Sequence, residues 1–262
     1  MKYLWNHLKS IESNIKKAAR TTLFLDFDGT LSPLRSIPQQ SKLPKQTKSV
    51  LEKLASMEHL HLAIVSGRTL SDIKARVGIE GIMYSGSHGM EWEYRGRCFT
   101  AEVPSETLEA LKAIKLEMED ISQNFKGSLV ENKIYSVAFH YRQVISGKKL
   151  ELEYSLHKKL AKYLRRHKVS LLMDKDTYDI RAHMGWTKGE VINGFKKLSS
   201  DDIGKIIYIG DSKTDEEAFE KLANDITIKV GLSKDSLAKY FLRDEQDVQR
   251  FLRWLLHTLQ AP

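Results

Sequence analysis

Apolar residues occur in short runs along much of this chain, and each run ends in polar or small residues. Four runs that predict buried strands occupy residues 22–25, 61–65, 82–84 and 205–209. Segments with helical spacing of apolar residues lie between them, as at 45–56 and 70–77. Because strands and helices alternate, the pattern predicts right-handed crossovers in a parallel sheet.

The middle of the chain has a different order of elements. It comprises a hairpin at 91–102, a helix at 105–121, strands at 129–131 and 135–141, a helix at 149–167 and a strand pair at 169–181. This order is typical of an α+β domain. We therefore predict an α/β protein in which a Rossmann-like, doubly wound parallel-sheet core, residues 1–102 and 183–262, is interrupted by an α+β insert at 103–182.

Both ends of the chain predict amphipathic helices that pack on the sheet. Leu4, Leu8, Ile11 and Ile15 share one helical face, as do Val248, Phe251, Leu252, Leu255 and Leu259. The first helix is basic, so contact with an anionic membrane is an alternative to packing on the protein. No run reaches the roughly 18 apolar residues that a membrane span needs, and we expect neither a span nor a signal peptide.

Composition restricts the partners. The 42 basic and 34 acidic residues give a net charge of +8, which leaves a polyanion-binding module as one alternative. The helix at 149–167 carries a basic stripe, namely Lys158, Lys159, Lys162, Arg165 and Arg166. Because aromatic residues for base stacking are lacking there, we expect a solvated surface and no nucleic acid. The single Cys98 excludes an internal disulfide and fits a cytoplasmic protein; we expect a monomer.

Pairs of carboxylates follow two of the predicted strands. Asp26 and Asp28 come directly after the run at 22–25, and Asp211 and Asp215 follow the run at 205–209. Ligands bind at the carboxyl ends of strands in open α/β sheets, where these side chains would meet. Either pair alone fits a turn or a helix cap. Together they favour a metal site, and hard oxygen ligands favour Mg²⁺.

The order of these groups resembles the four motifs of the haloacid dehalogenase-like phosphohydrolases. Asp26 and Asp28 match the first motif, Ser66 the second, Lys188 the third, and Asp211 with Asp215 the fourth. The resemblance implies that Asp26 attacks phosphorus to form an aspartyl-phosphate, and that Asp28 protonates the leaving group and then activates water. It also implies that Ser66, Gly67 and Arg68 bind the phosphate, that Lys188 offsets negative charge, and that Asp26, Asp28, Asp211 and Asp215 hold Mg²⁺.

Longer strings resemble one branch, the trehalose-6-phosphate phosphatases. They are LFLDFDGTL at 23–31, VSGR at 65–68, SGSHGMEW at 85–92, VENKIYSVAFHYR at 130–142 and GDSKTDEEAF at 210–219. This resemblance implies that the insert is a mobile cap that closes over a phosphorylated sugar and excludes water. It assigns His88, Glu131, Lys133 and Asp179 to substrate binding, whereas a Glu and a Lys on a hairpin are often only a solvated pair.

Two positions depart from the family pattern. Asp179 stands where the family carries a glutamate that is one methylene longer, and Ser212 stands where a second aspartate is common.

From the motif matches we predict a Mg²⁺-dependent phosphatase for trehalose 6-phosphate. The alternatives are a phosphatase for mannosyl-3-phosphoglycerate or sucrose 6-phosphate, and a non-catalytic sugar-phosphate sensor.

Overall fold

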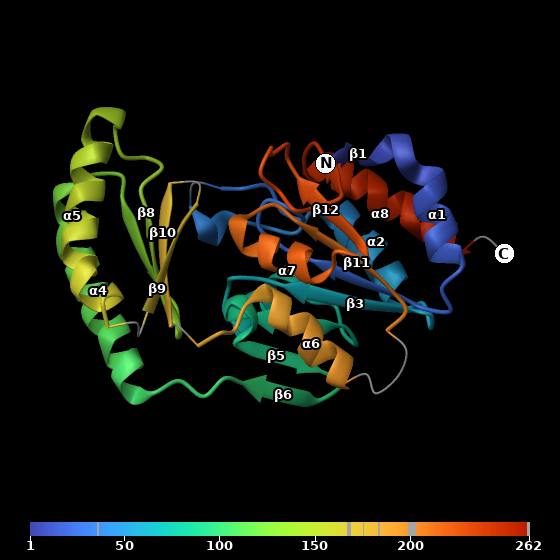
Figure 1. Cartoon of the computed structure of the whole chain (residues 1–262), viewed down its shortest axis with the longest axis horizontal. Helices are drawn as coiled ribbons and strands as arrows, with labels where there is room; N and C mark the ends of the chain where they lie inside the picture. The colour runs from blue at the N-terminus through green and yellow to red at the C-terminus, as the bar shows by residue number, and fades with distance from the viewer. Residues whose placement is uncertain (36, 167–168, 175, 183, 199–202, 261–262) are drawn as a thin grey trace. The chain divides into compact units, whose positions relative to one another are not determined.

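The chain forms two compact units in the computed structural model, which describes residues 1–35, 37–166, 169–174, 176–182, 184–198 and 203–260. The core unit comprises Met1–Thr100 and Trp186–Pro262, and the insert unit comprises Ala101–Gly185 (Figure 1). The predicted boundaries are residues 103 and 182; residue 183, where the second part of the core was expected to begin, lies outside the described residues. That the insert unit is a cap stays a prediction.

The described residues of the core unit form a mixed sheet of nine strands. In spatial order the strands are β1 (Lys2–Tyr3), β13 (Tyr240–Leu242), β12 (Ile226–Val230), β11 (Lys205–Gly210), β2 (Thr21–Leu25), β3 (Leu60–Val65), β4 (Met83–Gly86), β5 (Glu91–Tyr94) and β6 (Arg97–Thr100). Pairing is parallel from β1 to β4 and antiparallel from β4 to β6. The predicted parallel sheet is confirmed, with an antiparallel hairpin at one edge.

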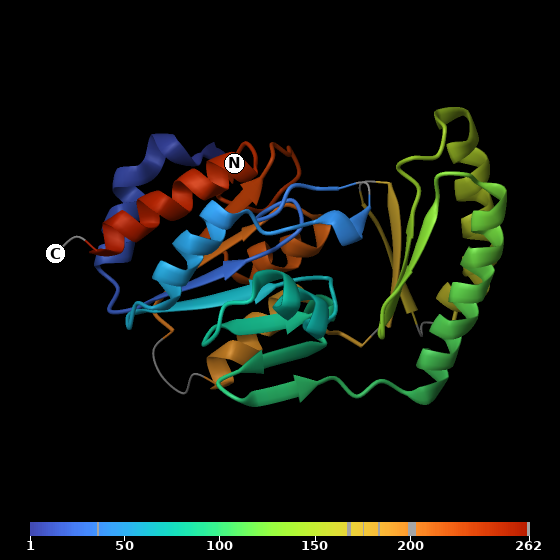
Figure 2. The same ribbon diagram turned by 180° about the vertical axis from the view of Figure 1, so that it is seen from behind.

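Helices cover both faces of this sheet. Successive residues of a strand point to opposite faces, so a strand in which successive residues are apolar has an apolar side chain to bury on each face. Leu23 and Leu25 of β2 pack with residues of α1 (Leu8–Lys16), α2 (Lys45–Ala55), α3 (Leu70–Val77) and α8 (Glu245–Gln260). Phe24 packs on the other face with residues of α6 (Lys188–Leu198) and α7 (Glu216–Lys221). Figures 1 and 2 show the two layers from opposite sides. The doubly wound arrangement is therefore confirmed.

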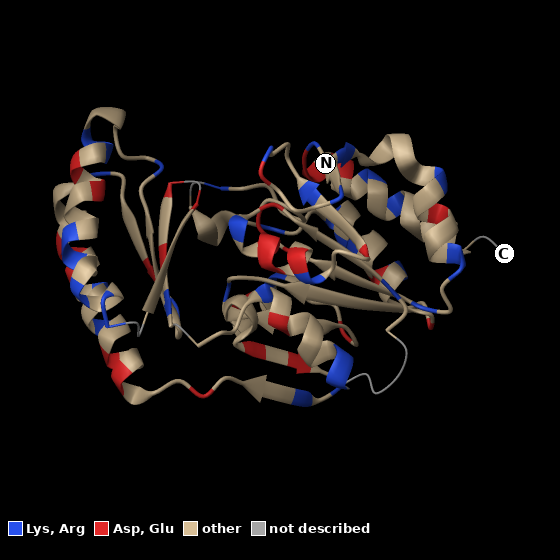
Figure 3. Cartoon of the chain, in the orientation of Figure 1, with Lys and Arg blue, Asp and Glu red and all other residues tan. Residues whose placement is uncertain are grey.

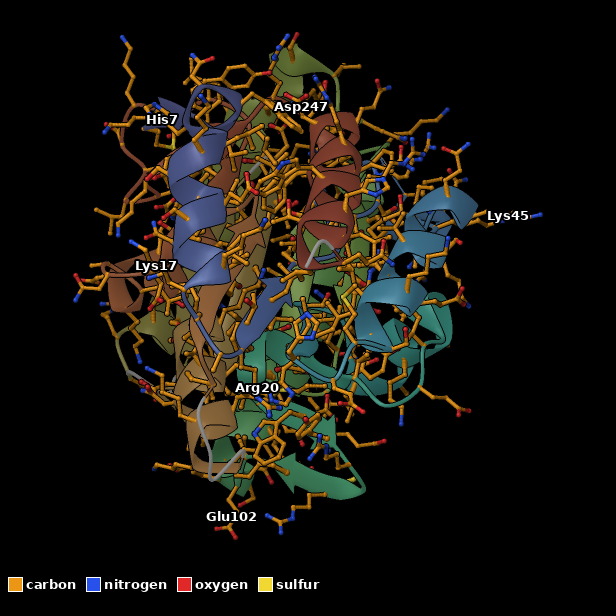
Figure 4. The ribbon with its side chains drawn as sticks, turned by 90° about the vertical axis from the view of Figure 1, so that its right-hand side faces the viewer. His7, Lys17, Arg20, Lys45, Glu102 and Asp247 are labelled. Atoms are coloured by element: carbon orange, nitrogen blue, oxygen red, sulfur yellow. The ribbon has the colours of Figure 1, made fainter. Side chains whose placement is uncertain are left out.

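The two ends of the chain pack against each other on one face of the sheet. Ile11 and Ile15 of α1 are buried in the same cluster as Phe251 and Leu255 of α8. Figure 4 shows the two helices side by side, with His7 and Lys17 flanking α1 and Asp247 near the start of α8. The sequence missed β1 and β13, which pair with each other over two residues and are too short to show a period. The helices in the described residues are all too short or too polar to cross a membrane.

The insert unit has a separate antiparallel sheet and two long helices. Its strands, in spatial order, are β7 (Leu129–Asn132), β8 (Ser136–His140), β10 (Thr177–Ala182) and β9 (Val169–Asp174), and its helices are α4 (Ser105–Asn124) and α5 (Ser146–Leu164). The predicted end of α5, residue 167, lies outside the described residues. The hydroxyl group of Tyr178 on β10 bonds His157 of α5, so alternate strand residues such as Phe139 and Ile180, which are buried, share the helix-covered face.

The opposite face of the insert sheet is polar. Glu131, Ala138 and Asp179 lie in register across β7, β8 and β10, and His140 pairs with Thr177 in the neighbouring row. Figure 3 shows acidic and basic residues interspersed along α4 and α5, and Lys162 of the predicted basic stripe forms an ion pair with Glu117. The described stripe residues are exposed, as a solvated helix surface requires.

Candidate active site

The carboxyl ends of β2 and β11 bring the two predicted acidic segments together. The backbone N–H of Asp26 donates to the carbonyl oxygen of Ile209 at 2.9 Å, which continues the strand pairing to the first aspartate. Gly29 has φ +80° and lies against the other segment: a Cβ atom at this position would be 2.1 Å from Oδ2 of Asp211. Glycine is therefore required sterically where the two loops meet.

Lys188 joins the two segments through its ammonium group. This residue begins α6, and its Nζ donates to Oδ1 of Asp26 at 2.6 Å and to Oδ1 of Asp215 at 2.8 Å. The side chains of Lys188, Asp26 and Asp215 are at most 6% exposed. A lysine that was isolated in the sequence thus forms two buried ion pairs at the carboxyl ends of the central strands β2 and β11.

Four hydrogen bonds orient the carboxylate of Asp215. Oδ1 accepts from Lys188 and from the Tyr208 hydroxyl group at 2.9 Å. Oδ2 accepts from the backbone N–H of Ser212 at 2.9 Å and from its hydroxyl group at 2.7 Å, which forms a capping box at the start of η4 (Lys213–Asp215). Ser212 therefore has a structural role as the partner of Asp215.

Burial and charge shift the protonation equilibria of this cluster in opposite directions. Burial raises the pKa of Asp26 well above its usual value; Lys188 opposes the rise, while Asp215 and Asp211 add to it. Burial would also raise the pKa of Asp215, but Lys188 and Ser212 outweigh it and the pKa is lowered. Burial alone would lower the pKa of Lys188, yet the two carboxylates hold it above its usual value. The ammonium group is thus charged at neutral pH.

The donor set of this cluster suits a hard divalent cation. Asp26, Asp211 and Asp215 are all buried, and one carboxylate oxygen from each lies within 4.8 Å of the others. Three carboxylates this close repel one another, and oxygen donors without sulfur or imidazole favour Mg²⁺ or a similar ion. Asp28, a further predicted ligand, is not in this group through its carboxylate, which bonds Arg68 instead; its part in metal binding stays a prediction.

Arg68 connects Asp28 to α3 and to the segment between β2 and α2 that contains Pro38. Its Nε and Nη2 donate to the two carboxylate oxygens of Asp28 at 2.7 and 2.8 Å, and its Nη1 donates to Asp72 at 2.8 Å. Nη2 also donates to the carbonyl oxygen of Pro38. The guanidinium group of Arg68 thus orients the predicted acid and base, and substrate binding by Arg68 stays a prediction.

Ser66 and Gly67 lie at the carboxyl end of β3, next to the loop that carries His88. The hydroxyl oxygen of Ser66 accepts from the backbone N–H of Arg68 at 3.1 Å. A Cβ atom on Gly67 would lie 2.5 Å from the imidazole ring of His88, so these two predicted substrate-binding residues are in contact. Ser87 and His88 have φ angles of +49° and +57°, and each such non-glycine residue costs on the order of 1 kcal/mol.

The insert unit brings together the other predicted substrate residues. Oε2 of Glu131 lies 3.1 Å from Nε2 of His140 and 3.7 Å from Nζ of Lys133, and Nδ1 of His140 lies 3.1 Å from the hydroxyl oxygen of Thr177. Asp179 is 3.8 Å from Arg181 on the same face. Glu131, Lys133 and Asp179 thus belong to one polar sheet face, which also carries His140 and Arg181.

Sequence reasoning missed the bonding role of Tyr208 and the carboxylate partners of Arg68 and His140. Tyr208 precedes the fourth motif by two residues, in an apolar run that gave it a core role only. The sequence pattern pairs Arg68 with no carboxylate, because Asp28 is 40 residues away, and it does not indicate that His140, inside the string at 130–142, bonds Glu131 nine residues away. Strand alternation could have indicated the His140–Glu131 contact. Glu131 pairs with Ala138, and His140, two residues after Ala138, lies on the same face of the sheet.

Comparisons with known proteins identify the family of this chain. The family model for trehalose-phosphatase matches residues 24–246. The chain is 29% identical to trehalose-phosphate phosphatase B of Arabidopsis thaliana over 260 residues, which cover 93% of this chain and 68% of that protein. It is 31% identical to trehalose-phosphate phosphatase of Mycobacterium bovis over 208 residues, which cover 78% of this chain and 51% of that protein.

Solved structures share the fold. The C-terminal domain of C. albicans trehalose-6-phosphate phosphatase superposes with a TM-score of 0.84 at 21% identity, covering 95% of this chain and 96% of that one. A haloacid dehalogenase-like hydrolase from Bacteroides thetaiotaomicron gives a TM-score of 0.63 at 12% identity, covering 90% and 99%. With the family model spanning both units, this chain belongs to the trehalose-phosphatase family.

Proposed function

We propose that this protein is a Mg²⁺-dependent phosphatase that hydrolyses trehalose 6-phosphate to trehalose and phosphate. The observation that carries the proposal is the buried Lys188, bonded to Asp26 and Asp215 beside Asp211. This cluster occurs in a chain that belongs to the trehalose-phosphatase family, whose members in plants and mycobacteria are named for this substrate.

Asp26 is the proposed nucleophile. Its carboxylate attacks phosphorus and displaces the sugar alkoxide, which gives an aspartyl-phosphate that water then hydrolyses. Asp26, Asp211 and Asp215 would hold Mg²⁺ through their carboxylate oxygens, and the ion would neutralise charge on the phosphate. Lys188 keeps one oxygen of Asp26 fixed at 2.6 Å and adds a positive charge beside the nucleophile.

Asp28 is the proposed acid and base. It protonates the leaving oxygen in the first step and removes a proton from the hydrolytic water in the second. Its bidentate pairing with Arg68 fixes the position of the carboxylate. Ser66 and the amides of Gly67 and Arg68 are proposed to bind phosphate oxygens.

The polar face of the insert sheet is the proposed recognition surface for the sugar. Sugar hydroxyl groups both donate and accept, so they can bond carboxylates such as Glu131 and Asp179 and the ammonium group of Lys133. His88 is proposed to contact the substrate from the core unit. The monomeric state, the cytoplasmic location and the absence of nucleic-acid and membrane partners stay predictions.

A substrate panel tests this proposal. Phosphate release is measured with Mg²⁺ present for trehalose 6-phosphate, sucrose 6-phosphate, mannosyl-3-phosphoglycerate, glucose 6-phosphate and an aryl phosphate. We expect a kcat/KM for trehalose 6-phosphate at least about a hundredfold above the others. Preference for sucrose 6-phosphate or mannosyl-3-phosphoglycerate would replace the substrate but keep the chemistry. Binding without turnover of any of them would identify a sugar-phosphate sensor instead.

A further inference from the structure

The loop between β4 and β5 has an unfavourable backbone conformation. Gly86 pairs with Glu91, so Ser87–Met90 closes a tight hairpin. Ser87, His88 and Gly89 are three consecutive residues with positive φ, at +49°, +57° and +103°. Glycine adopts this region freely, whereas Ser and His do so only where surrounding contacts hold them. The side chains around the loop therefore have to supply those contacts.

Glu91 supplies one of them. Its Oε2 accepts a hydrogen bond from the hydroxyl group of Ser87 at 2.7 Å and one from the backbone N–H of Leu70 at 3.4 Å. Leu70 is the first residue of α3, where a negative charge is favourable. A single carboxylate oxygen thus joins the hairpin turn, whose residues have positive φ angles, to the helix α3 that follows the Ser66–Arg68 loop.

The hairpin is bonded directly to the Ser66–Arg68 loop. The backbone N–H of Ser87 donates to the carbonyl oxygen of Arg68 at 2.6 Å, and that of His88 donates to the carbonyl oxygen of Ser66 at 3.0 Å. The imidazole ring of His88 fills the space above Gly67. If Ser87 and His88 left the left-handed region, both hydrogen bonds would break and the Ser66–Arg68 loop would lose its support on this side.

We propose that Glu91 is a positioning residue for phosphate binding, and that it acts by holding Ser87 in the left-handed conformation. Through Ser87 and His88 it fixes the backbone of Ser66 and Arg68. The inference rests on the proposed function, which assigns phosphate oxygens to the Ser66–Arg68 loop. It gives a role to a residue outside the proposed phosphate-binding and metal-binding groups.

The first test compares Glu91→Met with Glu93→Met. Glu93 lies on the same face of β5 two residues further along, and its carboxylate pairs with Lys74 at 2.7 Å and not with the hairpin. We expect Glu91→Met to raise both the KM for trehalose 6-phosphate and the inhibition constant of inorganic phosphate about tenfold, with a smaller change in kcat. Glu93→Met should leave both constants within about twofold of the wild type. Equal constants in the two variants would overturn the proposal.

The second test separates a positioning role from general destabilisation. Glycine at position 87 needs no side chain to hold a positive φ, so Ser87→Gly should make Glu91 dispensable. We expect Ser87→Gly alone to bind inorganic phosphate as the wild type does, and Ser87→Gly combined with Glu91→Met to regain most of the lost affinity. A double variant as weak as Glu91→Met would contradict the proposal. Wild-type protein that releases no phosphate from any substrate would instead refute the proposed function.

Discussion

Arg68 donates two hydrogen bonds to the carboxylate of Asp28, from Nε at 2.7 Å and from Nη2 at 2.8 Å. The same guanidinium group bonds Asp72 on α3 and the carbonyl oxygen of Pro38. Planar, bidentate geometry of this kind fixes the orientation of a carboxylate as well as its charge. The proposed acid and base is therefore held in place before any substrate arrives.

Replacement of Asp28 tests the acid and base role through the leaving group. Asp28→Asn cannot transfer a proton, and loss of general acid catalysis lowers rates by about a hundredfold to ten-thousandfold. A sugar alkoxide needs protonation as it leaves, whereas an aryl oxide needs it much less. We expect kcat for trehalose 6-phosphate to fall far more than kcat for the aryl phosphate. An equal loss with both substrates would rule out this role.

Replacement of Arg68 by lysine tests the bidentate pairing. Lysine keeps the charge but cannot bond both oxygens of Asp28 while also reaching Asp72. We expect Arg68→Lys to lower kcat about tenfold through loss of orientation, with the larger effect again on the sugar phosphate. The measurement is steady-state kinetics with both substrates, and unchanged kcat values would show that the pairing has no part in turnover.

Lys188 is predicted to stabilise the metal-free protein. Its removal leaves buried Asp26 and Asp215 without their cation, and breaking such pairs costs about 3 to 5 kcal/mol. Because Asp26 can take up a proton, we expect Lys188→Met to lose about 3 kcal/mol in urea unfolding at neutral pH. Lys221→Met, which removes a half-exposed ion pair with Glu190, should lose less than about 1 kcal/mol. Equal losses in the two variants would argue against a buried ionic cluster.

Asp72 makes stability depend on pH. Burial would raise the pKa of Asp72, but hydrogen bonds from Arg76 and Arg68 outweigh burial and lower it. A lowered folded-state pKa gives stability that is complete above the unfolded value of about 3.9 and is lost as the pH falls through the folded value. Because this side chain is 36% exposed, Asp72→Asn should cost only about 1 kcal/mol at neutral pH.

Urea unfolding of both proteins from pH 7 to pH 3.5 checks this prediction. The difference in free energy of unfolding should stay constant down to about pH 5 and then shrink as the pH falls further. A difference that grows towards acid pH would have the wrong sign for a lowered pKa.

Strand ends were predictable from the sequence because apolar runs stop abruptly at Asp26, Ser66 and Asp211. Parallel pairing then had to bring these residues to one edge. Contacts between segments that are far apart in the sequence were not predictable, since a side chain's partner depends on how those segments pack. Lys188 is 162 residues from Asp26, and Glu91 bonds Ser87 only because the hairpin turns through left-handed conformations. Motif order located the candidate site, while packing determined what each group bonds.

The turnover of trehalose 6-phosphate by Asp26→Asn tests the central claim most directly. Asparagine is nearly isosteric and can still accept a hydrogen bond from Lys188, so the variant should fold and keep the substrate in reach of Ser66. With Mg²⁺ present, we expect phosphate release to fall at least about ten-thousandfold below the wild type, with circular dichroism and thermal unfolding showing a folded protein. Turnover within about tenfold of the wild type by the folded variant would contradict Asp26 as the nucleophile and with it the proposed mechanism.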